Sequence, residues 1–376
     1  MTKGQLSQEK TDPAAVLARN QYDHRDDEID LKELLIALWQ GKFIIIAVTV
    51  FCTAVAIIYS LKAKDVWTTE AIITEPQISD FANYQKMVND FQPIFDVYQG
   101  GTILISQQLN SFVSSKYLFQ IYLQQYSARS NKKDFISSFG DFKAELERIR
   151  ETANDNEYRA AESSLYDGWY NRLPQPSGKS GNSSLKSIAG DAEKSFAFLN
   201  GYIKYIENQA RSVIIANLNS VIESKHNELI QQKNILMDQA KSRLKDEREL
   251  ARYALQIAKV AGVDKPQQNL GDQEIFAINI GSNALEAKVR VLDSLSVDQL
   301  SLIEPRLQVI NSKLNLLNTL KVNPNVVFNT FQYVEEPEIP LSRTSPKRRL
   351  IAILGLLLGG VLGCFIVLVR FAFRDK

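Results

Sequence analysis

The sequence predicts an α+β membrane protein: two transmembrane helices flank an α/β base from which a very long helix projects. Two uncharged apolar runs, residues 43–61 and 350–369, lie near the ends of the chain. Each is long enough to cross a hydrocarbon core of roughly 30 Å as a helix. Strand-like sequence lies near both runs, and residues 191–261 between them contain no proline and a single glycine, Gly201. Helices between flanking strands favour a base with a helical protrusion.

The composition bounds the function. The chain has 376 residues, and its 44 basic side chains nearly balance its 43 acidic ones. Net charge therefore gives no reason to expect nucleic acid or another polyanion as a partner. The two cysteines, Cys52 and Cys364, both lie inside the apolar runs, so they cannot form a disulfide in a water-soluble domain.

Residues 1–42 are predicted to be a cytoplasmic N-terminal segment. Its first 25 residues are polar and are expected to be disordered. An amphipathic helix at the membrane surface follows, with Asp30 as its cap and Trp39 at the interface. Its apolar face consists of Leu31, Leu34, Leu35 and Leu38. A docking site for a partner is the alternative reading of this helix.

The two apolar runs determine the expected topology. The first run is too long and too far from the N-terminus for a cleaved signal peptide, so it is expected to remain as an anchor. Two spans place both ends of the chain on one side. The tail, residues 370–376, is rich in basic residues, as is usual for a cytoplasmic end. Residues 62–349 then lie on the other side, in the periplasm. The basic residues at the end of this region do not oppose that placement, because long loops are translocated largely regardless of charge.

The body between the spans is predicted from its periodicity and its breakers. Three strands, several helices, one surface loop and two helices that return after the long helix are expected. The strands are 66–73, 185–189 and 325–334; the helical regions are 78–126, broken by Pro93 and Gly100-Gly101, and 131–170; the loop is 171–184; the returning helices are 272–292 and 297–320, the second with Pro305 inside it.

The long helix is expected to begin at its cap, Asp191, and to end at Gly262 and Pro266. Its first half carries a dense apolar stripe of Phe196, Leu199, Ile203, Ile206, Ala210 and Val213. Between residues 223 and 249, by contrast, twelve of 27 residues are charged and only seven are apolar. A helix this polar cannot be buried on most of its circumference, so it needs a partner helix or copies of itself.

The second apolar run contains a glycine stripe. Gly355, Gly359 and Gly363 recur at every fourth position and so share one helix face, with Gly360 next to it. Small residues let membrane helices approach closely, which predicts a helix contact. The contact could be with another copy, with the first span or with a different protein. Plain tolerance of glycine in membrane helices is the alternative.

A proline-rich segment precedes this run and is predicted to be a rigid strut, because proline fixes φ. The residues that make up this motif are Pro337, Pro340, Ser345, Pro346 and Lys347. A direct partner-binding role is the alternative. The basic residues at its end could bind lipid phosphates, although basic anchors are usual at a membrane edge.

Catalysis, cofactors and metals are not expected. His24 and His226 are isolated in the sequence, and no cluster of acid, base or metal-ligand residues stands out. Gly178-Lys179-Ser180 is similar to the end of a phosphate-binding loop, but Leu173 occupies the position of that loop's first glycine.

These motifs together resemble the Wzz-type polysaccharide co-polymerases, the chain-length determinants of bacterial O-antigen lipopolysaccharide. The most specific part is Pro337-x-x-Pro340, then Ser345-Pro346-Lys347, then Gly359-Gly360-Val361-Leu362-Gly363. The approach to the first span is similar to the family as well, and so are Leu250–Gln267, which is similar to the end of the family's long helix, and Ile280–Leu285 after it. The chain departs from the family over 92–178, which is not matched, and at Cys364-Phe365, where smaller residues are common.

The resemblance implies a non-catalytic regulator in the inner membrane. Family members form ring-like homo-oligomers and work with the Wzy polymerase, which extends O-antigen on a lipid carrier. They set the modal chain length of that polymer. The resemblance also implies two further partners, lipid-linked O-antigen polysaccharide and membrane lipids.

Two alternatives stay open at the level of sequence. The regulated polymer could be another Wzy-dependent one, such as enterobacterial common antigen or capsule. A protein of a different class, a two-span periplasmic sensor, would need an output domain, and the seven residues after Val369 are too few for one.

Overall fold

The computed structural model describes residues 31–374 except for 100, 179–180 and 267–275. The chain divides into two compact units. The anchor unit consists of residues up to 65 together with 344–376, and the body consists of residues 66–343. The predicted cap Asp30, the polar N-terminal 25 residues and His24 lie outside the described residues.

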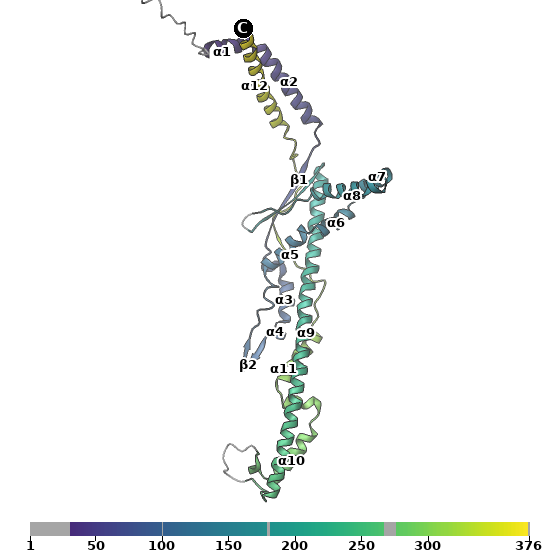
Figure 1. The fold of residues 1–376 in the computed structure, drawn as a ribbon, viewed down its shortest axis with the longest axis vertical. Helices are drawn as coiled ribbons and strands as arrows, with labels where there is room; N and C mark the ends of the chain where they lie inside the picture. Colours follow the sequence, from purple (N-terminus) through teal and green to yellow (C-terminus); the bar gives the residue numbers. More distant parts are fainter. Residues whose placement is uncertain (1–30, 100, 179–180, 267–275, 375–376) are drawn as a thin grey trace, which may run out of the picture. The chain divides into compact units, whose positions relative to one another are not determined.

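The anchor unit contains three helices, α1 (Leu31–Gln40), α2 (Lys42–Lys62) and α12 (Arg348–Arg374). By length and composition, α2 and α12 are candidate membrane spans, and most of their apolar side chains are not covered by protein. The two helices lie side by side (Figure 1). Their contacts run in opposite sequence directions, from Gly355 beside Ala56 to Gly363 beside Ile45, so the pair is antiparallel.

The sheet of the body has three antiparallel strands in the order β4-β1-β5. The central strand β1 (Trp67–Thr74) pairs with β4 (Ser183–Ala189) on one side and with β5 (Gln332–Glu335) on the other. The first two strands confirm the expectations for 66–73 and 185–189. Most of the third was predicted wrongly.

The third strand is short because the residues before it pack against a different part of the chain. The N–H of Asn329 donates to the carbonyl of Asp80 at 2.9 Å, and the ring of Phe328 stacks on Tyr84 with centroids 4.5 Å apart. Phe328 and Phe331 are both buried. The apolar residues of 325–331 thus pack on a helical segment instead of a sheet face, and their backbone is irregular.

The long helix α9 (Ala192–Val260) has 69 residues. At 1.5 Å per residue it is about 104 Å long. The carboxylate of Asp191 accepts a hydrogen bond from the N–H of Lys194 at 3.0 Å, as its predicted capping role requires. The helix ends just before Gly262, whose φ of +66° suits glycine. The prediction of one very long helix is confirmed.

The helical region after β1 contains more breaks than predicted. A 3₁₀ turn, η1 (Ile78–Phe81), leads into α3 (Ala82–Asp90) and α4 (Gln92–Phe95). A hairpin of β2 (Val97–Gln99) and β3 (Thr102–Leu104) follows, which the expectation of helix over 78–126 missed. The glycine pair at 100–101 is the local signal for it, since glycine readily adopts the φ > 0 of hairpin turns.

Four helices then precede β4, in agreement with the charged helical pattern of 131–170. They are α5 (Ser115–Ser127), α6 (Arg129–Ser138), α7 (Gly140–Thr152) and α8 (Asp155–Tyr170). We call α6, α7 and α8 together the side lobe, since they project sideways from α9 (Figure 1). A loop connects α8 to β4, close to the predicted loop.

The returning segment consists of η2 (Ile278–Ile280), α10 (Ser282–Ser294), η3 (Val297–Leu302) and α11 (Arg306–Thr319). The first half of the predicted helix 272–292 was wrong where it is described, because the helix begins only after Gly281, with φ +85°. The single helix predicted for 297–320 was wrong too. Proline lacks an N–H and clashes with the preceding turn, so Pro305 starts a new helix.

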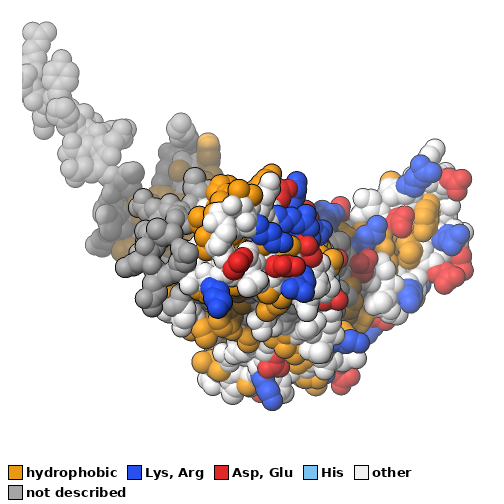
Figure 2. Space-filling view, turned by 90° about the horizontal axis from the view of Figure 1, so that it is seen from below, with side chains coloured by type: hydrophobic (Ala, Val, Ile, Leu, Met, Phe, Trp, Pro, Cys, Tyr) orange, Lys and Arg blue, Asp and Glu red, His pale blue; other side chains and the backbone are white. Residues whose placement is uncertain are grey.

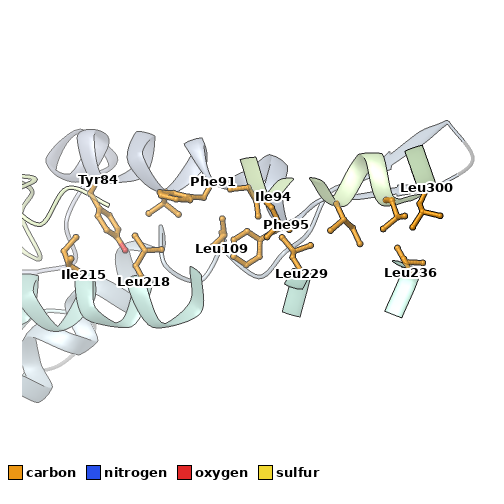
Figure 3. Packing of buried hydrophobic residues seen from close by; sticks show 14 of the residues in the cluster. Tyr84, Phe91, Ile94, Phe95, Leu109, Ile215, Leu218, Leu229, Leu236 and Leu300 are labelled. Carbon is orange, nitrogen blue, oxygen red and sulfur yellow. The ribbon is translucent and has the colours of Figure 1, made fainter. Parts of the chain in front are cut away.

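The core of the body follows α9 along its length. Near β1 it is aromatic, with Tyr122, Tyr126, Trp169, Phe198, Tyr202 and Phe331 buried together. The predicted stripe included Phe196 and Val213, but these two are only partly buried. Phe198 and Tyr202, which were not in the predicted stripe, are buried instead. Farther along, Ile215, Leu218, Leu229 and Leu236 of α9 face Tyr84, Phe91, Ile94 and Leu300 (Figure 3).

The polar half of α9 therefore has its partner helices in the same chain. Helices α10 and α11 pack along it, and Leu229, Leu236, Ala240 and Leu244 form the buried seam. The remaining surface is well hydrated. Viewed from the α10 end, basic and acidic side chains lie interspersed, as the balanced composition suggests (Figure 2).

Candidate functional site: the glycine face of α12 and the proline segment

The predicted glycine stripe lies against α2 within the same chain. A Cβ added to Gly355 would lie 2.7 Å from the Cβ of Ala56. At Gly359 it would lie 2.7 Å from the Cα of Thr49, and at Gly363 2.8 Å from the Cα of Ile45. Real Cβ atoms do not come this close, so at these positions any side chain would push the two helices apart.

Gly360 differs from the other three glycines. A Cβ there would meet nothing within 4 Å, so this residue faces away from α2. The structure thus brings together Gly355, Gly359 and Gly363 and separates Gly360 from them. A face that is free within one chain remains available to lipid or to another helix.

The surface of α2 that meets the glycines is small and has its polar groups satisfied. The hydroxyls of Thr49 and Thr53 donate to carbonyls one turn earlier in their own helix, both at 2.8 Å. Such internal bonds remove the cost of a free hydroxyl in an apolar environment. Close approach of the backbones is then favoured by packing alone.

The proline-rich segment does not form one cluster in the structure. Pro337 and Pro340 are partly buried and belong to the body, whereas Ser345, Pro346 and Lys347 belong to the anchor unit. Residues 336–347 contain no helix or strand. Pro346 is buried and follows a cis peptide bond, while Ser345 and Lys347 are exposed.

The start of α12 is tied to the end of α2 by charge. The guanidinium of Arg348 bonds to the carboxylate of Asp65 at 3.1 Å, with both side chains about one-third exposed. Of the basic residues that follow the prolines, Arg348 therefore has a protein partner besides any lipid phosphate.

Sequence reasoning missed an ion cluster on the far part of the body. The carboxylate of Glu304 is 3% exposed and accepts from Arg306 at 2.6 Å and from Arg243 at 2.8 Å. The hydrogen bond from Arg306, supported by the charges of both arginines, holds the pKa of Glu304 below its ordinary range. Arg243 is 61 residues away in the sequence, so no local pattern could reveal the pair.

An exposed apolar stripe near the end of α9 was also missed. It consists of Leu250, Tyr253, Ile257 and Val260, at helical spacings of three, four and three. Val260 is 86% exposed. The helical spacing of these apolar residues is visible in the sequence, directly after the charged residues that precede position 250.

The described residues contain no group of three or more side chains able to hold a metal ion. In Gly178-Lys179-Ser180, the segment similar to a phosphate-binding loop, residues 179 and 180 lie outside the described part of the chain. Burial raises the pKa values of the tyrosines in the aromatic core, and it raises that of the partly buried Tyr333 beside them to about 12. These groups stay neutral and serve packing.

A body with one long helix, joined at both ends to candidate membrane helices, is the architecture of a membrane-anchored scaffold. The sequence matches the Wzz family model, described as chain length determinant protein, over residues 27–133. It is 26% identical over 358 residues to the chain length determinant protein of Escherichia coli K12, covering 94% of this chain and 95% of that one. It is 24% identical to the ferric enterobactin transport protein FepE of the same organism, covering 93% and 91%.

Solved structures agree. A full-length bacterial polysaccharide co-polymerase superposes with a TM-score of 0.60 at 25% identity, covering 93% of this chain and 99% of that chain. The wild-type Shigella flexneri chain-length regulator WzzBSF shares the fold at a TM-score of 0.50 and 18% identity, covering 74% and 99%. The chain is similar to the Wzz-type polysaccharide co-polymerases in sequence and in fold, as its motifs indicated. Proteins of this family are regulatory scaffolds and not enzymes.

Proposed function

We propose that this protein sets the modal chain length of lipopolysaccharide O-antigen, as an oligomeric scaffold for the Wzy polymerase in the bacterial inner membrane. The observation that carries the proposal is the extent of the likeness: it runs through 94% of this chain and 95% of a chain length determinant. A regulator without chemistry of its own must act by holding other molecules.

The proposed topology follows the charges. Residues 1–42 and 370–376 are cytoplasmic, residues 43–61 and 350–369 cross the membrane, and residues 62–349 are periplasmic. Arg370 and Arg374 at the end of α12 support a cytoplasmic C-terminus. The body then stands where lipid-linked polysaccharide is within reach, with membrane lipids around α2 and α12.

A ring-like homo-oligomer is the proposed working state. The apolar stripe of Leu250, Tyr253, Ile257 and Val260 supports it, because the side chains are exposed in the single chain and a copy of the same helix would cover them. The glycine face holds α12 against α2, and the proline segment acts as a strut between body and membrane.

Deletion of the gene, followed by electrophoresis of the lipopolysaccharide, tests this function. We expect the clustered bands of one modal length to give way to an unregulated ladder, and a plasmid copy to restore them. An O-antigen pattern unchanged by deletion would contradict the proposal. Altered enterobacterial common antigen or capsule in the same strain would then indicate the alternative polymer.

A further inference from the structure

A groove of about 550 Å³ lies on the side lobe between α6 and α8. Three cationic side chains line it: Arg129 and Lys133 from α6 and Arg159 from α8. Tyr166 and Tyr170 form its apolar wall. Neither the co-polymerase function nor the glycine and proline motifs account for this groove. Its volume falls within the roughly 300–1,000 Å³ of small-molecule sites.

The aromatic wall is held in place by neighbours. Tyr166 and Tyr170 lie one turn apart on α8, with ring centroids 6.0 Å apart and planes at 26°. The hydroxyl of Tyr166 shares a hydrogen bond of 2.9 Å with that of Ser137. Phe142 packs against the ring of Tyr166 at 4.6 Å. A fixed wall costs little entropy when a ligand packs against it.

The cations are placed over the aromatic rings. The Nζ of Lys133 lies 5.3 Å from the ring centroid of Tyr166, and the guanidinium carbon of Arg129 lies 4.5 Å from that of Tyr170. Cation–π attraction keeps both charges at the wall and leaves the ammonium group of Lys133 able to donate hydrogen bonds.

The groove has unused positive charge. Arg129 is paired with Asp167 at 2.7 Å. Lys133 and Arg159 are exposed and form no ion pair with any residue in the part of the chain that the structure describes. One carboxylate, Glu162, lines the groove as well. Two unpaired cations beside one acid favour a ligand that carries negative charge and also has groups to donate to a carboxylate.

We propose that this groove binds an acidic saccharide, a sugar unit that carries a carboxylate or a phosphate. Lys133 and Arg159 bind the anionic group. The hydroxyls of Ser130 and Ser163, which also line the groove, and the carboxylate of Glu162 exchange hydrogen bonds with sugar hydroxyls. The C–H face of the sugar packs on the tyrosine wall. That the ligand is part of a polysaccharide rests on the proposed function; that the groove selects acidic over neutral sugars does not.

Isothermal titration calorimetry of the full-length protein in detergent tests the proposal. The probes are trigalacturonate, which is acidic, maltotriose, which is neutral, and inorganic phosphate. We expect trigalacturonate to bind and maltotriose to bind at least about tenfold more weakly, because each charge-assisted hydrogen bond contributes about 1.5–3 kcal/mol and 1.4 kcal/mol is a factor of ten. Phosphate should displace trigalacturonate only in large excess.

A pair of double variants provides the matched control. Lys133→Ala with Arg159→Ala should weaken trigalacturonate binding about tenfold or more. Lys143→Ala with Arg148→Ala removes the same charge from exposed positions of the same lobe outside the groove and should leave binding nearly unchanged. Should the first variant lose helicity, the single changes Lys133→Gln and Arg159→Gln repeat the comparison.

The proposal is overturned if trigalacturonate does not bind, if maltotriose binds equally well, or if the groove variant binds like the control variant. Phosphate that competes at equal concentration would overturn the saccharide part, since the groove would then recognise charge alone. A strain that keeps its normal lipopolysaccharide banding while the groove binds no sugar would refute this inference and leave the proposed function intact.

Discussion

Glu304 shows at the scale of one residue how charge stabilises the body far from its sheet. Its carboxylate links Arg243 on α9 with Arg306 at the start of α11. The two arginine side chains are 57% and 61% exposed, so their own charges stay hydrated. The carboxylate is the buried partner, and its loss removes the bridge between the two arginines, leaving the hydrogen bond from Arg306 to Gln239 at 3.3 Å between α11 and α9.

Glu304→Gln should destabilise the protein at neutral pH by about 1 to 2 kcal/mol, less than a fully buried pair would because both arginines remain solvated. The urea midpoint followed by circular dichroism in detergent measures it. Glu286→Gln, which removes an exposed carboxylate 3.9 Å from Lys259, is the control and should change little.

This difference should depend on pH in one direction. Because the folded-state pKa of Glu304 is lowered, its contribution is fully present above the pKa of an unfolded glutamate, about 4.3, and is lost as pH falls through the folded-state value. The difference in unfolding free energy between wild type and Glu304→Gln should therefore disappear at acid pH. A gap that widened there would contradict the assignment.

At the scale of elements, the α2–α12 pair contains the helix contact that the glycine spacing predicted. The four-residue spacing of the glycines predicted a helix contact but left its partner open. The structure places α2 of the same chain against Gly355, Gly359 and Gly363. Gly360, which the four-residue spacing places beside this face, has no neighbour from α2 within 4 Å of an added Cβ.

Cysteine cross-linking can test this packing. A Cβ at position 359 would lie 3.0 Å from the Cβ of Cys52, near enough for a disulfide after slight adjustment. With Cys364→Ala as background, oxidised Gly359→Cys should form a Cys52 cross-link within one chain, and Gly360→Cys should not. Peptide mass spectrometry identifies the link.

The same experiment separates the possible partners of the glycine face. A cross-linked product of monomer mass on a non-reducing gel supports the intrachain pair. A dimer of Gly359→Cys would indicate instead that the face meets another copy. Equal cross-linking of both variants would show that the face is not specific.

Other elements show why local sequence was insufficient. Pro305 was placed inside one helix because the apolar period continues across it, yet the missing N–H divides the segment into η3 and α11. The β2–β3 hairpin was missed because three-residue strands are too short to show a period of two. Residues 325–331 alternate like a strand, but Phe328 packs on Tyr84 of α3 and Phe331 packs on Tyr122 of α5.

At the scale of the whole molecule, the exposed stripe near the end of α9 is the feature that a single chain leaves unexplained. Ile257→Asp with Val260→Asp would place two charges on it. If copies meet there, the oligomer should dissociate or lose subunits, because an unpaired charge is costly to bury. Single-particle images and light scattering in detergent measure the change.

Lys245→Gln is the control for that change. It makes the same helix more negative at an exposed position outside the stripe and should keep the oligomer intact. Unchanged assembly of the double aspartate variant would show that copies do not meet through this stripe.

The sequence by itself determined the membrane class, the two apolar helices, the single long helix with its Asp191 cap, and two of the three strands of the sheet. These depend on local composition, spacing and breakers, which act over a few residues. Only the tertiary structure decided which glycines face α2, how Glu304 pairs, and that Arg129, Lys133 and Arg159 line one groove. Each of these joins residues distant in the sequence, and packing of the whole chain, which no local pattern encodes, selects such partners.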